Sequence, residues 1–239
     1  MRYSLACVVA GALSLGGCGA EIPIPVQSIL LSVDNEPLRF RGASDLPGAL
    51  SVQSLCAAGD TIETRDSSRA SLALLPNALV IVEANTRLKI VDLALRKDGN
   101  ETAYDSMREK RAHVHLERGT IFGSQERPDV AAEPVLTMDT ADGSLVSSFD
   151  TTFEMMRDQR GTRVVCASGL LYFQPRGQRD AVELEGGSFG EWSADAGHVA
   201  AVESDAAAQA ELSEVLEVVP KLRALRDAQR NKLPVVRGR

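Results

Sequence analysis

Short runs of β-branched and apolar residues, each ended by a turn signal, are the feature that most limits what this chain can fold into. Such runs recur from Leu50 onward: RASLALL, LVIVE, RLKIVDL, RAHVHLERGTIFG, VLTMD, SLVSSF, TFEMM, RVVCA, LLYFQ, AVELE and SFGEW. Turn-forming residues separate them, for example at Asp142-Gly143, Gly169 and Gly186-Gly187. Many short strands with regular turns predict an all-β sandwich or barrel. The runs lie too close together for crossover helices, which argues against a parallel α/β sheet.

Length and composition predict one globular domain with extensions. The chain has 239 residues, of which 44% are hydrophobic and 25% are charged. Its net charge is -7. An acidic protein without a basic motif does not favour phosphate backbones, so we expect no nucleic-acid partner.

The first residues predict export followed by lipid anchoring. Arg2 precedes an uncharged apolar stretch from Leu5 to Leu15, which is too short to span a membrane but has the length of a signal-peptide core. Leu15-Gly16-Gly17-Cys18 then resembles a lipobox. We therefore predict a signal peptide over 1–17, a lipid such as palmitate on Cys18 and an extended tether over 18–27. We expect the protein on the periplasmic side of a membrane. The sorting rule of enteric bacteria assigns it to the outer membrane. No later segment is apolar enough to cross a membrane.

A change of hydrophobic period predicts a helical tail over 204–232. Leu212, Val215, Leu216 and Val219 follow helical spacing, and Ser204 is a candidate N-cap. Pro220 should kink this helix or start a second one. The apolar stripe must cover either the β domain or a partner.

The segment after residue 56 resembles the opening of a FecR-type domain. The matching positions are Gly59, Asp60, Ile62, Thr64, Leu72, Leu74, Asn77 and Thr86, followed by the Leu-x-x-Gly element Leu116–Gly119. Later elements match less well: Thr140-Ala141 lacks the family's proline, and Asp150 stands where the family has glycine before Thr151-Thr152-Phe153. The likeness covers about residues 50 to 195.

The resemblance implies a jelly-roll-like β-sandwich of short antiparallel strands over 28–195, with no catalytic site. The protein that names the family carries a transmembrane helix and a cytoplasmic segment for a sigma factor. This chain shows neither, and a lipid on Cys18 would place every mature residue outside the cytoplasm. The resemblance therefore implies a binding or scaffold domain.

Two cysteines are expected to form a disulfide. Cys7 leaves with the signal peptide and Cys18 carries the lipid, which leaves Cys56 and Cys166 in an oxidising compartment. Parity and compartment therefore predict a Cys56–Cys166 bridge.

Enzymatic and metal sites find little support in the sequence. Gly186–Gly190 matches the nucleophile-elbow pattern around Ser188, but the following EWSADAG does not predict the helix that the motif needs. His113 and His115 share one face of a strand and could begin a metal site, yet His198 is the only other histidine. We predict no catalytic residue, no cofactor and no metal.

The function expected from the sequence is that of a non-enzymatic envelope lipoprotein that binds a protein or glycan partner. The alternative is a small-ligand sensor that reports to another envelope protein. A broad exposed patch or a free apolar helix would favour the first function. A deep apolar pocket with convergent polar groups would favour the second.

Overall fold

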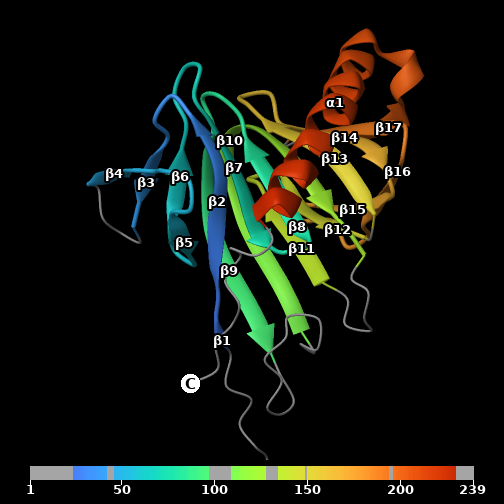
Figure 1. The fold of residues 1–239 in the computed structure, drawn as a ribbon. Helices are drawn as coiled ribbons and strands as arrows, with labels where there is room; N and C mark the ends of the chain where they lie inside the picture. Colours follow the sequence, from blue (N-terminus) through green and yellow to red (C-terminus); the bar gives the residue numbers. More distant parts are fainter. Residues whose placement is uncertain are drawn as a thin grey trace, which may run out of the picture.

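The protein folds into two β-sheets with one long helix at the C-terminal end (Figure 1). The computed structural model describes residues 24–41, 46–96, 109–127, 134–148, 150–193 and 196–229. The predicted all-β class with a helical tail is confirmed. The predicted signal peptide over 1–17 and Cys18 lie outside the described residues, as do residues 230–232 of the predicted helical tail. None of the described helices has an apolar stretch long enough to span a bilayer.

The first sheet, sheet A, is mixed in strand length but almost entirely antiparallel. In spatial order its strands are β4 (Pro47–Ala49), β3 (Leu38–Phe40), β6 (Thr61–Glu63), β9 (Arg87–Arg96), β10 (Glu109–Gln125), β11 (Pro134–Asp139), β12 (Gly143–Ser147), β15 (Leu170–Pro175) and β16 (Val182–Glu185). The short strand β1 (Ile24–Pro25) pairs with the far end of β9. Among the described pairings, β10 with β11 is parallel, which departs from the expected antiparallel pattern.

The second sheet, sheet B, is antiparallel throughout its described pairings. Its order is β5 (Leu55–Ala57), β2 (Gln27–Asp34), β7 (Arg69–Leu75), β8 (Ala78–Val82), β10, β13 (Thr151–Arg157), β14 (Thr162–Ser168), β17 (Ser188–Trp192) and β18 (Gly197–Ala201).

Strand β10 belongs to both sheets and changes sheet at Gly119. Residues 109–118 pair with β9 in sheet A, whereas residues 119–125 pair with β13 and residues 121–125 with β8 in sheet B. Gly119 has φ of +94°, and a Cβ there would lie 2.2 Å from Thr86 Oγ1. Only glycine combines this backbone conformation with such close contact, so the expected Leu-x-x-Gly element marks the crossing point.

The main core lies between the two sheets, and alternation along each strand builds it. Leu72 and Leu74, expected on one face of β7, are both buried in it. At one end of this core, the Trp192 ring stacks on Phe173 with centroids 3.9 Å apart. Burial of this continuous apolar cluster supplies the main driving force for folding.

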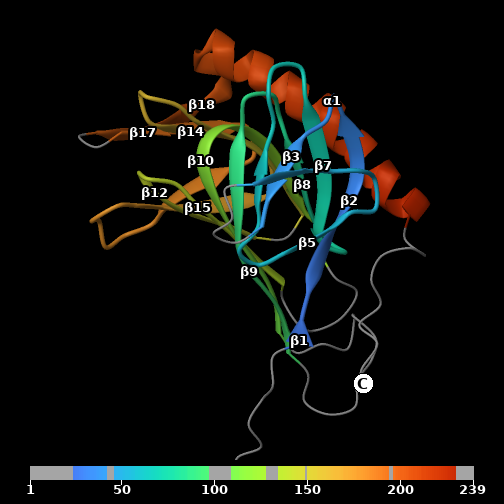
Figure 2. The same cartoon turned by 90° about the vertical axis from the view of Figure 1, so that its left-hand side faces the viewer.

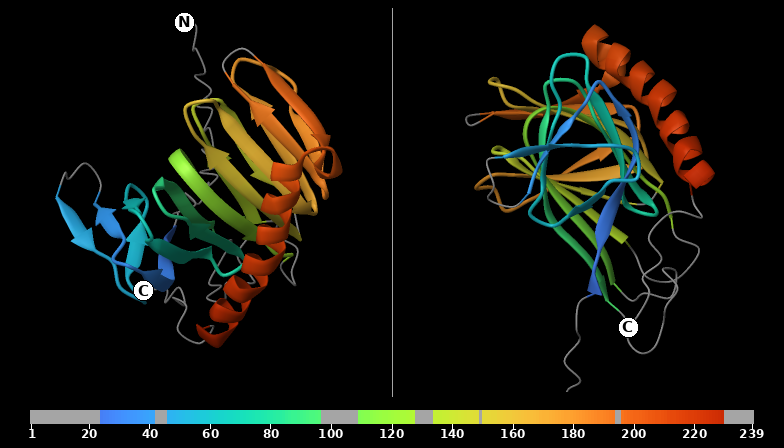
Figure 3. Two further views of the ribbon diagram at one scale, coloured as in Figure 1. Left: turned by 90° about the horizontal axis from the view of Figure 1, so that it is seen from above. Right: turned by 60° about the vertical axis from the view of Figure 1, so that its left-hand side comes forward.

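Helix α1 (Ala206–Gln229) covers the outer face of sheet B (Figure 3). Its buried side chains, Val215, Val219 and Leu222, pack on a second apolar cluster that includes Ile81 and Phe122. A third, smaller cluster, with Val165, Phe189 and Ala208, lies under its first turn. The apolar stripe therefore covers the β domain and does not lie free.

Two details of the expected helix are corrected. The N-cap is Asp205, whose Oδ1 accepts the Ala208 N–H at 2.7 Å, while the predicted cap Ser204 donates to the Ala201 carbonyl. Pro220 lies inside α1 and starts no second helix, because the helix continues to Gln229.

The expected domain boundaries are also too narrow. The predicted tether over 18–27 ends inside the sheets, because β1 begins at Ile24 and β2 at Gln27. At the other end, β18 extends sheet B to Ala201, beyond the predicted limit of 195. β18 is short and rich in alanine and glycine, so it lacks the β-branched signal of the other strands.

Candidate functional site

The outer face of sheet A is covered by none of the described elements. Figure 2 shows α1 on the side of the molecule away from β12 and β15. One row of outward side chains crosses the sheet through strand register: Asp92, His113, Thr137, Val146, Tyr172 and Glu183, with Val91 in the β-bulge next to Asp92. Val135 lies one pleat from this row on β11. Val91, Val135 and Val146 are 39%, 39% and 37% exposed. We call this surface the sheet A face.

Paired charges occupy the β9–β11 side of the sheet A face. His113 Nε2 lies 2.5 Å from Asp139 Oδ2, and Arg111 Nη2 lies 2.8 Å from Asp92 Oδ2. His113 and His115 do share a face of β10, as expected from their spacing. Among the described residues, no group of three histidine, cysteine or acidic side chains is placed to hold a metal ion. The face therefore offers apolar contact beside polar groups, which suits binding of a macromolecular surface.

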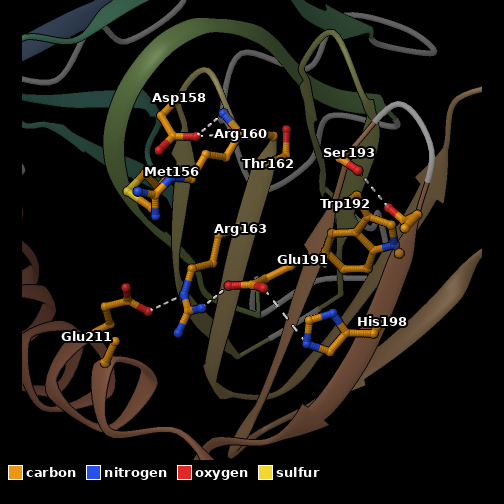
Figure 4. A pocket seen from close by; sticks show the side chains of 14 residues that line it. Met156, Asp158, Arg160, Thr162, Arg163, Glu191, Trp192, Ser193, His198 and Glu211 are labelled. Carbon is orange, nitrogen blue, oxygen red and sulfur yellow. Dashed lines mark hydrogen bonds and ion pairs between the residues drawn. The ribbon is translucent and has the colours of Figure 1, made fainter.

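A pocket of about 530 Å³ opens between β14, β17, β18 and the start of α1 (Figure 4). Arg163 lies at its centre, with a side chain that is 11% exposed. Its Nε donates to Glu211 at 2.8 Å, Nη2 to Asp205 at 3.1 Å and Nη1 to Glu191. Its guanidinium also lies 4.6 Å from the centre of the Phe189 ring.

These contacts give the pocket a structural role. Each guanidinium nitrogen of Arg163 already has a carboxylate partner, so the group has little capacity left for an anionic ligand. The network instead joins β14 to β17 and to the first turns of α1. A desolvated arginine among three carboxylates is a strong tie between these elements.

The nucleophile-elbow pattern around Ser188 lies in the turn that leads from β16 of sheet A to β17 of sheet B. Ser188 starts strand β17, and its Oγ donates to the Glu185 carbonyl at 2.6 Å. A strand follows the serine where the motif needs a helix. The local fold thus explains Gly186 and Gly187 as turn residues.

Cys56 and Cys166 are two free, buried thiols in this structure. They lie on β5 and β14, and β2, β7, β8, β10 and β13 stand between these strands in sheet B. Neighbouring strands lie about 4.8 Å apart, and a disulfide needs Cα atoms within about 7 Å. The structure therefore does not contain the predicted bridge, because cysteine parity carries no information about spatial distance.

Three of the positions that carry the FecR-type resemblance, Thr64, Thr86 and Gly119, meet in one buried junction. Thr64 Oγ1 donates to the Thr86 carbonyl at 3.2 Å and accepts the Thr86 N–H at 2.9 Å. Thr86 Oγ1 in turn donates to the Thr120 carbonyl at 3.1 Å, next to Gly119. The junction fastens the turn after β8 to the crossing point of β10.

Backbone geometry also explains one further matching position and one position that departs from the family pattern. Gly59 has φ of +92°, and its N–H donates to the Ile90 carbonyl at 2.8 Å. Asp150, which stands where the family has glycine, has φ of +53°. Aspartate is among the few residues that tolerate this region, so the substitution keeps the turn.

Sequence reasoning missed Arg163 and Glu154, the most deeply buried charged residues beneath α1. Glu154 is 7% exposed and lies on β13 between apolar neighbours. One signal was present: in TFEMM a glutamate interrupts a run that is apolar on both sides. A strand covered on both faces would need such a residue to be buried.

Comparisons with known proteins give a partial likeness only. No protein-family model and no curated protein sequence matches the chain. Two crystal structures, at 1.65 and 2.50 Å, of a candidate anti-sigma factor from Parabacteroides distasonis ATCC 8503 are similar, with 12% identity and TM-scores of 0.40 and 0.41. Each match covers 59% of this chain and 57% of that chain.

Proposed function

We propose that this protein is a non-enzymatic cell-envelope lipoprotein that binds a protein or glycan partner through the sheet A face. The uncovered state of this face carries the proposal. Sheet B is buried on both sides, by the core and by α1, whereas the sheet A face leaves Val91, Val135 and Val146 in solvent. An apolar group of this kind beside polar residues is typical of interaction surfaces.

The proposal includes membership of the FecR-type domains. The support is that Thr64 and Thr86 are hydrogen-bonded to each other and that Thr86 packs closely on Gly119, as residues of a shared structural motif should. Anchoring through Cys18 is the second part of the proposal. Replacement of Cys18 by serine should abolish incorporation of labelled palmitate, and undiminished labelling would contradict the anchor.

A small-ligand sensor finds less support. Its pocket should contain polar groups that are free to meet a ligand. The pocket around Arg163 is lined instead by charges that satisfy one another. The geometry thus favours the binding module over the sensor.

Site-specific photocrosslinking tests the proposed surface. A photoreactive residue is placed at Val146 on the sheet A face or, as a matched control, at Leu216 on the solvent side of α1, which is 55% exposed. In cells that naturally produce the protein, we expect a discrete adduct from position 146 and none from position 216. Tyr172→Glu, one strand away, should weaken the adduct at 146. Equal adducts from both positions, or none from 146, would refute this surface.

A further inference from the structure

The interface between α1 and sheet B contains a carboxyl group without adequate compensation. Glu154 is 7% exposed, and its Oε2 has no hydrogen-bond partner among the described residues. In the strand register it lies between Phe122 of β10 and Val165 of β14, which are both buried. A buried charge in such surroundings is costly unless it is paired.

The charged groups that face Glu154 are mostly acidic, so they add repulsion to the cost of burying its carboxylate. From sheet B these are Glu83, which follows β8, and Arg163 of β14; from α1 they are Glu211 and Glu214. Arg163 is already shared among three carboxylates, and it pairs directly with Glu211. Glu83 takes a salt bridge from Arg69 at 2.8 Å, but its Oε1 also lacks a partner. Acids therefore outnumber cations in this part of the interface.

The protonation state of Glu154 follows from these surroundings. Burial, together with the negative charges of Glu211 and Glu214, raises the pKa of Glu154 from 4.5 to about 8. The docked helix thus favours the neutral acid. Ionisation would place a negative charge beneath α1. Water can solvate this charge most directly if the helix moves away from sheet B.

The two ends of α1 are held by separate ion-pair networks. Arg163 holds the first turns through Asp205 and Glu211. Near the C-terminal end, Arg223 and Arg226 both reach Glu126 of the sheet B side. Between these ties the helix rests on the apolar contacts of the second cluster. Glu211 and Glu214, the α1 residues whose charges act on Glu154, lie at and just after the first of these ties, so docking of this stretch opposes ionisation of Glu154.

We propose that α1 is a pH-gated cover of sheet B, which stays docked while Glu154 is protonated and loosens when Glu154 ionises. The gate exposes the apolar cluster around Ile81 and Phe122 as the pH rises. It is independent of the sheet A face, which lies on the opposite side of the sandwich.

Amide hydrogen exchange of the full-length chain tests the gate. Protection of α1 is measured between pH 5.5 and 8.5 and corrected for intrinsic exchange rates. From the two pKa values, the opening equilibrium of α1 should rise on the order of a hundredfold over this range. Peptides of β13 and β14 should keep their protection, because only the cover moves.

Two variants separate this mechanism from general destabilisation. Glu154→Gln should abolish most of the rise, while Glu217→Gln, an equivalent change on the exposed side of α1, should leave it as in wild type. Glu214→Gln removes one repelling charge at the helix surface and should reduce the rise even where Glu154→Gln folds poorly. Wild-type α1 with pH-independent protection, or an undiminished rise in Glu154→Gln, would overturn the proposal.

Discussion

Replacement of Gly119 by alanine should destabilise the protein severely, because this residue lets β10 cross from sheet A to sheet B. Its φ of +94° is unfavourable for any residue with a Cβ. The added Cβ would lie 2.2 Å from Thr86 Oγ1 and 2.5 Å from Thr86 Cα. Because backbone atoms are involved, the clash forces the turn after β8 away from β10.

The expected loss combines conformational strain with broken hydrogen bonds. A left-handed conformation costs a non-glycine residue about 1–2 kcal/mol. Moving the turn away from β10 also weakens the hydrogen bonds of Thr86 Oγ1 to the Thr120 carbonyl and to the Thr120 N–H, at 3.1 and 2.8 Å. Each bond contributes about 1 kcal/mol, and more where a buried group is left unpaired. We therefore expect Gly119→Ala to lower the free energy of unfolding by about 3–5 kcal/mol.

Gly187→Ala supplies the matched control. Gly187 has φ of +86°, but no atom lies within 4 Å of its ideal Cβ, so this variant should show the strain alone. Urea unfolding followed by circular dichroism measures both variants under one condition. If Gly119→Ala loses no more stability than Gly187→Ala, the argument from close contact at the crossing point is wrong.

Three other outcomes follow from the buried groups. The pKa of Glu154 is raised to about 8 in the folded state, so wild type and Glu154→Gln should be equally stable below pH 4.5. Between pH 4.5 and 8 the wild type should become progressively less stable than Glu154→Gln, by about 3–5 kcal/mol in urea unfolding. Parallel pH profiles of the two proteins would contradict this loss of stability. Arg163→Met should cost about 2–4 kcal/mol, because it strands three carboxylates, whereas Lys221→Met at an exposed pair should cost under about 1 kcal/mol in thermal unfolding. Mass spectrometry of denatured, unreduced protein should find Cys56 and Cys166 alkylated as free thiols. The native protein should resist alkylation, because burial raises the pKa of both thiols, that of Cys166 to about 12. A disulfide-linked peptide pair would show that the bridge forms after all.

Strand positions followed from sequence because their signal is local. RASLALL coincides with β7, and alternation placed Leu72 and Leu74 correctly in the core. The turn glycines were likewise visible from sequence. The helix was found from its spacing, although Leu216, assigned to the apolar stripe, is 55% exposed. Helical spacing defines a stripe only to within one residue at its edges.

The predicted disulfide and the missed charges had one common cause. Cys56 and Cys166 looked equivalent in sequence, yet five intervening strands of sheet B separate them. Arg163 gave no sign of its three partners, because they lie between 28 and 48 residues further along the chain. Distances of this kind depend on the order of strands in a sheet, which local patterns do not encode.

The sequence by itself determined the β-rich class, the turns, the helical tail and the motif that predicts a lipid on Cys18. Each of these depends on residue types within a few positions of one another. Only the tertiary structure decided that β10 serves two sheets, that α1 covers sheet B while no described element covers the sheet A face, and that Glu154 is buried with no hydrogen-bond partner for Oε2 among the described residues. The physical reason is that burial and electrostatic compensation depend on all neighbours in space, and those neighbours come from segments far apart in the chain.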